Sequence, residues 1–248
     1  MNATRVLLVG AEGRMGHAIR SVAEGAAEIE ITAMAEVGDS LDEPVTRCDV
    51  VVDFSHADAT AGVCAACVRA GKPLVCGTTG HSADQLKTID RATEKIPLLL
   101  APNFSVGVNA LFWLTRKAAE LLGPSFDLEI VEAHHRLKRD APSGTAKRLA
   151  EILCDVRRLS YDKNVAHGRA GILGERSRDQ IGMHAMRGGD IVGDHTVIFA
   201  GRGERVELTH RASSRETFAT GAVRAARWII GRSPGRYSMD DVLGLSGS

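Results

Sequence analysis

The chain has 248 residues, of which 44% are hydrophobic and 25% are charged. This balance is typical of a compact globular protein and excludes the disordered and fibrous classes, while the length favours two domains of modest size. The 31 basic residues equal the 31 acidic ones, so the formal net charge is zero. We therefore expect no nucleic-acid partner and no membrane surface as a partner, and local groups must hold any anion that binds.

The cysteines and the first apolar run predict a cytoplasmic location. Residues 6–10 are too few for a secretory signal or a membrane span. Five cysteines form no even disulfide framework and are expected to be free thiols. Cys64 and Cys67 make a C-x-x-C, so a redox pair or half of a zinc site is an alternative. No second such pair exists, and buried cysteine packs as a small apolar side chain.

The first hundred residues alternate short apolar runs with helical patterns. The expected strands are 6–9, 29–35, 49–54, 73–76 and 96–101, and the expected helices are 15–24, 57–70 and 83–95. Strands that alternate with helices through short connections specify a parallel, doubly wound sheet of the Rossmann-like α/β class.

The pattern changes after residue 105. A long helix is expected over 108–122, then a strand over 127–133 and a helix that starts near Thr145. The segments 181–187, 194–200 and 205–210 have short polar or glycine-rich connections, as successive antiparallel strands do. The stretch 162–178 is rich in glycine and arginine and is expected to be a surface loop.

A strong helical pattern returns over 218–230, and its apolar face needs the first domain as cover. The second domain is thus expected to be an insertion. Residues 1–105 and 216–248 would form the dinucleotide-binding domain, and residues 106–215 an α+β domain for substrate. We expect closure about hinges near Ser105 and Arg215 to precede the reaction.

The turn after the first strand has glycine at every third position, at Gly10, Gly13 and Gly16. Glycines let backbone N–H groups approach a pyrophosphate, which a helix N-terminus also favours. Glycines also serve as plain turn residues, so the context matters. Glu36 ends the second apolar run, where a carboxylate accepts hydrogen bonds from ribose hydroxyls. These features predict a dinucleotide cofactor.

The residue after this acid bears on the choice between NADH and NADPH. It is Val37, which offers no cation to a 2′-phosphate, so NADH is expected to be preferred or equal. Arg14 and Lys72 are the cations that can still reach a phosphate. Two loops, 77–79 and 101–104, follow sheet strands where ligands bind in such folds, with ordinary strand-to-helix turns as the alternative.

Polar groups crowd the segment 132–146, directly after an expected strand. Two adjacent histidines, His134 and His135, precede several cations and a Ser-Gly-Thr helix start at 143–145. The hydroxyls and successive N–H groups of that start make a seat for a carboxylate. A zinc site is the alternative, but adjacent histidines diverge in extended chain and no H-E-x-x-H or cysteine pair accompanies them. We expect no metal.

Four motifs, in order, resemble the dihydrodipicolinate reductase family: G-x-x-G-R-M-G, G-T-T-G, N-F-S-x-G-V-N and E-A-H-H-x-x-K-x-D-A-P-S-G-T-A. The stretches 187–195 and 210–219 are similar to it as well, so the resemblance covers nearly the whole chain. It implies NADH- or NADPH-dependent reduction of 4-hydroxy-tetrahydrodipicolinate, a small cyclic dicarboxylate, in diaminopimelate and lysine biosynthesis. It also implies a homotetramer, built by pairing the sheets of the second domains.

The resemblance further implies roles for single residues. His134 would be the acid/base group and Lys138 a proton donor. The expected substrate contacts are Lys138, His135, Ser143, Gly144, Thr145 and Thr79. The expected cofactor contacts are Gly10, Ala11, Glu12, Gly13, Arg14, Met15, Glu36, Gly77, Thr78, Thr79, Ala101, Pro102, Asn103, Phe104 and Arg215.

The chain departs from the family's pattern in three places. Glu12 stands where glycine is common and would crowd the pyrophosphate, Val37 replaces a common arginine, and the segment 36–49 is shorter than usual. Two other functions compete with the reductase. Another two-domain dehydrogenase would explain the glycine turn but not His-His-x-x-Lys with Ser-Gly-Thr. A non-enzymatic dinucleotide sensor would need the cofactor site alone.

Overall fold

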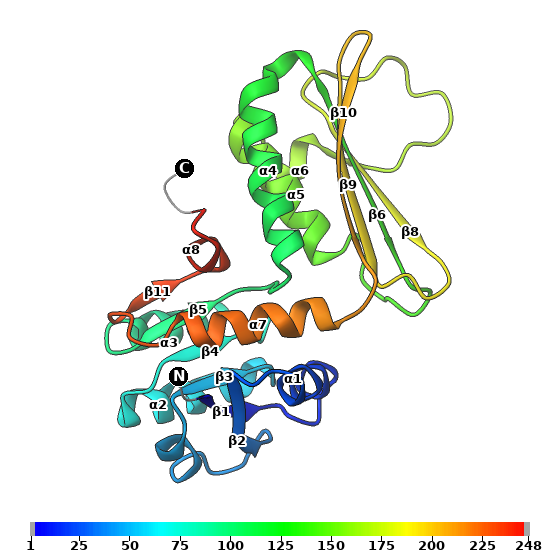
Figure 1. Cartoon of the computed structure of the whole chain (residues 1–248). Coiled ribbons are helices and arrows are strands. Elements are labelled where there is room, and N and C mark those ends of the chain that lie inside the picture. The colour runs from blue at the N-terminus through cyan, green and yellow to red at the C-terminus, as the bar shows by residue number, and fades with distance from the viewer. Residues whose placement is uncertain (1–2, 246–248) are drawn as a thin grey trace. The chain divides into compact units, whose positions relative to one another are not determined.

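A computed structural model describes residues 3–245 and separates them into two compact units (Figure 1). Unit 1 contains the chain up to Val106 together with the chain from Arg215 onward, and unit 2 spans Gly107–Ser214. Each unit has its own sheet and its own apolar core. Within the described range, no helix combines the length and the apolar character that a membrane crossing requires.

Unit 1 holds a six-stranded sheet whose strands are all parallel, in the order β11-β5-β4-β3-β1-β2. The strands are β1 (Thr4–Val9), β2 (Ile29–Ala35), β3 (Val50–Asp53), β4 (Leu74–Cys76), β5 (Pro97–Leu100) and β11 (Gly235–Tyr237). Every residue of β3 and β4 is buried, as a sheet covered on both faces requires. The predicted Rossmann-like architecture is confirmed.

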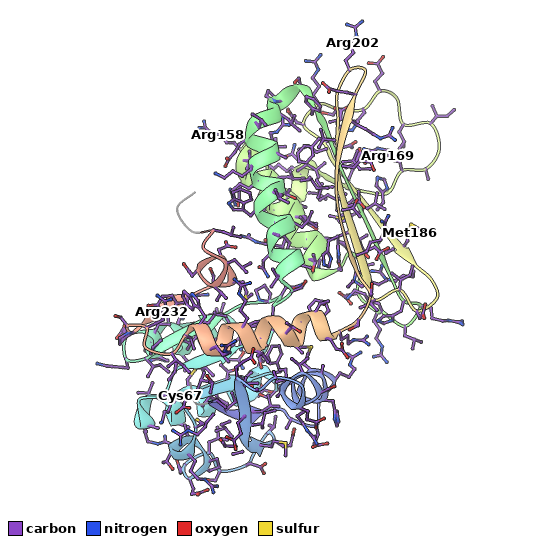
Figure 2. The ribbon with its side chains drawn as sticks, viewed as in Figure 1. Cys67, Arg158, Arg169, Met186, Arg202 and Arg232 are labelled. Carbon is purple, nitrogen blue, oxygen red and sulfur yellow. The ribbon has the colours of Figure 1, made fainter. Side chains whose placement is uncertain are left out.

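Helices cover both faces of this sheet. They are α1 (Arg14–Glu24), α2 (Thr60–Ala70), α3 (Ala83–Thr93), α7 (Glu216–Trp228) and α8 (Met239–Leu243), with short 3-10 turns at Pro44–Arg47 and Ala57–Ala59. Residues of α1, α7 and α8 share one core, and residues of α2 and α3 share the other, which contains the fully buried Cys67 (Figure 2). The helix expected over 218–230 does return to the first domain, as α7.

Unit 2 holds a five-stranded mixed sheet in the order β10-β9-β6-β8-β7. The strands are β6 (Asp127–His134), β7 (Val165–His167), β8 (Ile181–Arg187), β9 (Gly193–Ala200) and β10 (Arg205–Ala212), and the helices are α4 (Val106–Leu122), α5 (Gly144–Arg157) and α6 (Tyr161–Asn164), with a 3-10 turn at Gly123–Ser125. Residues of α4 and α5 share a core with one face of the sheet, as Figure 1 shows. Side chains at alternate positions of β6 therefore face this core.

Two expectations for unit 2 were wrong. The strands β9 and β10 pair antiparallel as expected, but β8 does not pair with β9, because β6 lies between them and pairs with β8 in parallel. A parallel pair needs a long crossover, and the chain from α5 to β7 supplies it. The stretch 162–178 contains most of α6 and all of β7 rather than loop alone.

Candidate active site

The glycine turn of unit 1 is closely packed. Gly10 has a φ of +80°, and a Cβ there would lie 2.6 Å from the carbonyl oxygen of Phe54. A Cβ on Gly16 would lie 2.3 Å from the carbonyl oxygen of Gly10. Gly13, the N-cap residue of α1, supplies no side-chain cap. The turn thus has the close backbone approach and the uncapped helix start that a pyrophosphate needs.

Glu36 is held against this turn. Its carboxylate accepts a 2.8 Å hydrogen bond from the backbone N–H of Glu12, and its own N–H donates to Asp39 at 2.8 Å. The carboxylate of Glu12 pairs with Arg20 at 3.0 Å and with His17 at 3.6 Å, both on α1. These partners on α1 offset the charge of Glu12, so the departure from glycine leaves no isolated carboxylate in the turn.

A cavity of about 440 Å³ adjoins Glu36 and is rich in carboxylates. Its charged lining residues are Glu36, Asp39, Asp42, Asp58 and Arg69. Arg69 donates a 2.5 Å hydrogen bond to Asp42, so its charge is already paired. Acidic side chains therefore outnumber the one basic side chain in the lining of this cavity.

The loops that follow β3 and β4 are joined by a buried carboxylate that the sequence analysis overlooked. Asp53 ends β3 with no exposed surface and accepts hydrogen bonds from the Ser55 hydroxyl (2.5 Å) and the Ser55 N–H (3.0 Å). That N–H also reaches the Thr78 hydroxyl at 3.0 Å. Burial raises the pKa of Asp53. A Cβ on Gly77 would lie 2.2 Å from the Phe54 ring, so this ring packs directly against the backbone of Gly77.

The expected cofactor residues of unit 1 follow its strands at one edge of the sheet. The turn 10–15 follows β1, Glu36 follows β2, the loop 77–79 follows β4 and the loop 101–104 follows β5. The carboxyl ends of parallel strands meet at one edge, which is where dinucleotides bind in such sheets. Arg215 stands apart in sequence as the N-cap residue of α7.

The expected catalytic residues of unit 2 occupy the end of β6 and the loop after it. His134 is the last residue of β6 and is only 8% exposed, whereas His135 is half-buried. The Nδ1 atom of His134 lies 2.6 Å from a carboxylate oxygen of Glu132. Lys138 pairs with Asp140 at 2.9 Å within the same loop. The pairing helps to lower the pKa of Asp140.

Glu132 has no exposed surface and is the most heavily bonded group here. Arg187 of β8 donates to both of its oxygens, at 2.7 and 2.8 Å, and the N–H of Ser143 donates at 3.1 Å. Burial opposes ionisation, but the hydrogen bonds from His134, Arg187 and Ser143 outweigh it and lower the pKa of Glu132 to about 2. Glu132 is therefore a carboxylate at neutral pH.

Ser143 is the N-cap residue of α5, and its polar atoms are used within the fold. Its hydroxyl accepts from the N–H of Ala146 at 3.2 Å and lies 2.9 Å from Nε2 of His195. Only 2% of Ser143 is exposed. Ser143 therefore supports the helix start, and its expected contact with the substrate stays a prediction, as do those of Gly144 and Thr145.

Comparison with known proteins decides the family. The model for the dihydrodipicolinate reductase N-terminus matches residues 4–104, and the model for its C-terminus matches residues 107–243. The chain belongs to the dihydrodipicolinate reductase family. It is therefore an enzyme, an oxidoreductase with 4-hydroxy-tetrahydrodipicolinate reductase activity in lysine biosynthesis. Members of this family use NAD(P)H.

Individual members of the family match along nearly their whole length. The 4-hydroxy-tetrahydrodipicolinate reductase of Akkermansia muciniphila is 54% identical over 241 residues, which cover 97% of this chain and 98% of that protein. The enzyme of the same name from Alkalilimnicola ehrlichii is 46% identical over 265 residues, covering 98% and 99%. The fold matches that of a dipicolinate-bound dihydrodipicolinate reductase from Paenisporosarcina sp. TG-14, with a TM-score of 0.80, 24% identity and coverage of 95% and 97%.

Proposed function

We propose that this chain reduces 4-hydroxy-tetrahydrodipicolinate with His134 as its acid/base group and Lys138 as a second proton donor. The observation that carries the proposal is the 2.6 Å contact between His134 and the buried Glu132 at the end of β6. Histidine exchanges protons near neutral pH, and a carboxylate partner steadies its charged form. The test is oxidation of the cofactor by purified protein in the presence of freshly made substrate.

The proposed chemistry needs one hydride and one proton for each water released. When bound, the nicotinamide supplies the hydride to C4 of the substrate ring. His134 is the group proposed to deliver the proton. Lys138 can bind a substrate carboxylate and give up a proton as electron density grows beside it. The helix start at Gly144 and Thr145 would hold a carboxylate through backbone N–H groups and the Thr145 hydroxyl.

For the cofactor, the glycine turn at 10–15 is proposed to hold the pyrophosphate, and Glu36 the adenosine ribose. The loops 77–79 and 101–104, with Arg215, are proposed as its remaining contacts, and Thr79 also as a contact of the substrate. The absent Cβ atoms of Gly10 and Gly16 and the uncapped start of α1 support this assignment.

We expect kcat/KM for NADH to equal or exceed that for NADPH. The cavity beside Glu36 carries several carboxylates and one paired arginine, and Val37, which is 56% exposed, brings no charge. Val37→Arg should shift the preference toward NADPH by up to about 1.5 to 3 kcal/mol, the worth of a charge-assisted hydrogen bond. Steady-state kinetics with both cofactors measures the shift.

Val37→Gln is the matched control, because it adds a long polar side chain without charge. A wild type that strongly prefers NADPH and is unmoved by the arginine would show that the adenosine site lies elsewhere. Equal shifts in the arginine and glutamine variants would show that side-chain size, not charge, sets the preference.

We expect Thr145→Val to weaken the binding of a planar pyridine dicarboxylate by about 1 to 3 kcal/mol, because a hydrogen bond to a charged group is lost. Dinucleotide binding should persist, since the cofactor residues belong to unit 1. Calorimetric titration measures both affinities. Thr196→Val, on β9, is the control, and unchanged affinity in the Thr145 variant would place the carboxylate seat elsewhere.

The oligomer and the location complete the proposal. We propose a homotetramer in which the sheets of unit 2 pair through the face that α4 and α5 leave open. Val131 and Ile198 are partly buried apolar residues of β6 and β9 outside the core shared with α4 and α5, and a second sheet would cover them.

A cytoplasmic location is consistent with the five buried, unpaired thiols.

A further inference from the structure

The carboxylate of Glu132 is enclosed by donors on every side. Each of its two oxygens accepts two hydrogen bonds: one oxygen binds His134 and Arg187, and the other binds Arg187 and the N–H of Ser143. A carboxylate has about four acceptor positions, so all of them are used. A buried charge with this many partners is fixed in place, and so are the groups bound to it.

This arrangement determines which nitrogen of His134 carries a proton. An ionised carboxylate only accepts hydrogen bonds, so Nδ1 of His134 must be the protonated donor to Glu132. The second nitrogen, Nε2, is then the atom that gains or loses a proton. A Cβ on Gly193 would lie 3.0 Å from Nε2, so the neighbour on that side is a residue without a side chain.

Arg187 joins Glu132 to the substrate loop. It lies opposite His134 in the parallel pairing of β6 with β8, and it also donates a 2.7 Å hydrogen bond to the carbonyl of Asp140. Glu132 therefore holds both ends of the loop between His134 and α5, through His134 at one end and the N–H of Ser143 at the other, and Arg187 adds a tie at Asp140. The acid/base histidine and the helix start share one anchor.

His195 bounds the His134 ring on another side without adding charge. The two rings meet edge to face with centroids 5.1 Å apart. Burial, together with the nearby charge of His134, lowers the pKa of His195 to about 3, so His195 is neutral during catalysis. The charged group that contacts His134 is Glu132, which also binds Arg187, and Lys138 is paired to Asp140 in the following loop.

We propose that Glu132 is a positioning residue for the reduction: it keeps His134 in the form protonated at Nδ1, leaves Nε2 to exchange the proton, and is itself held by Arg187. This inference rests on the role proposed above for His134. Carboxylate partners of this kind fix the tautomer and the orientation of an imidazole. Removal of the charge alone should therefore impair the reaction even where the fold survives.

Unit 2 contains a matched counterpart on the opposite face of β6. Glu129 accepts hydrogen bonds from Arg169 at 2.9 and 3.0 Å, from Arg176 at 3.0 Å and from Nε2 of His184 at 2.8 Å. Its pKa is also about 2: burial opposes ionisation, and hydrogen bonds from Arg169, His184 and Arg176 outweigh it. Glu129→Gln thus removes a similar charge from a similar cluster without touching His134.

The test compares Glu132→Gln with Glu129→Gln in the full-length protein. Glu132→Gln should lower kcat by about 10- to 100-fold while the dissociation constant of the cofactor stays within about twofold, and Glu129→Gln should keep kcat within about twofold of wild type. Circular dichroism and thermal unfolding establish that both variants fold.

Nitrogen-15 NMR of the histidine rings, recorded without cofactor, is the second readout. Wild-type His134 should show a protonated Nδ1, and Glu132→Gln should show a mixture of tautomers, because an amide can either donate or accept. Unchanged kcat, an unchanged nitrogen pattern or an equal loss in Glu129→Gln would overturn the inference. If wild type fails to reduce the substrate, the proposed function falls instead, and the NMR comparison still tests the hold of Glu132 on His134.

Discussion

Replacement of His134 by alanine is expected to lower kcat by about two to four orders of magnitude, the usual worth of a positioned acid/base group. The change removes the imidazole whose Nδ1 lies 2.6 Å from Glu132 and leaves Lys138 and water as the remaining proton sources. Cofactor affinity should barely change, because the residues proposed to hold the dinucleotide belong to unit 1. Steady-state kinetics and a dinucleotide titration measure the two effects.

His184→Ala is the control for this variant. His184 is also a histidine of the unit 2 sheet with a carboxylate partner, Glu129, at 2.8 Å. It should retain kcat within a few-fold of wild type. Near-normal turnover of the His134 variant at neutral pH would show that another group moves the proton.

Arg187→Ala is expected to reduce the free energy of unfolding by about 3 to 5 kcal/mol, the cost of leaving one member of a buried ion pair without its partner. Glu132 would lose two of its four hydrogen bonds and would stay buried with its charge. Urea unfolding at a single protein concentration measures the change, since assembly makes apparent stability depend on concentration.

Arg211→Ala is the matched control for stability. Arg211 approaches Asp194 at 3.5 Å with a side chain that is 73% exposed, and exposed ion pairs contribute only about 0 to 1 kcal/mol. A small loss for Arg187→Ala, equal to that of the control, would mean that Glu132 remains satisfied without its arginine. The positioning role proposed for Glu132 would then need another anchor.

The architecture of unit 1 could be predicted because its local patterns are strong. The run of valines at 50–52 is apolar throughout, as a strand between two helical layers must be, and the strand predicted over 29–35 has the bounds that β2 shows. From β1 to β5 the strands and helices follow one another without an inserted domain, so their order along the chain nearly determines the topology.

The pairing in unit 2 could not be predicted in the same way. The strands β8, β9 and β10 each have a recognisable pattern, but the pattern of a strand does not name its partner. β6 separates β8 from β9 only because α5, α6 and β7 carry the chain across the sheet. The strand β7 of unit 2 has three residues, too few to show any periodicity, and the same holds for β11 of unit 1.

The candidate active site could likewise be predicted only in part from the sequence. His134, Lys138 and the helix start at 143–145 occupy one continuous segment, so their grouping is visible in the sequence. Arg187 and His195 come from other strands, and only the register of β6 with β8 and β9 brings them to Glu132. Glu132 lies in the visible segment, yet its role depends on these distant partners.

The central claim, that the chain transfers a hydride from a nicotinamide to C4 of the substrate ring, is tested most directly with deuterium. Purified wild-type protein is given freshly made 4-hydroxy-tetrahydrodipicolinate and NADH that carries deuterium at C4 of the nicotinamide on the transferred face. We expect cofactor oxidation and tetrahydrodipicolinate with one deuterium at C4 of its ring. Cofactor oxidation without deuterium in the product, or no oxidation with substrate present, would contradict the account.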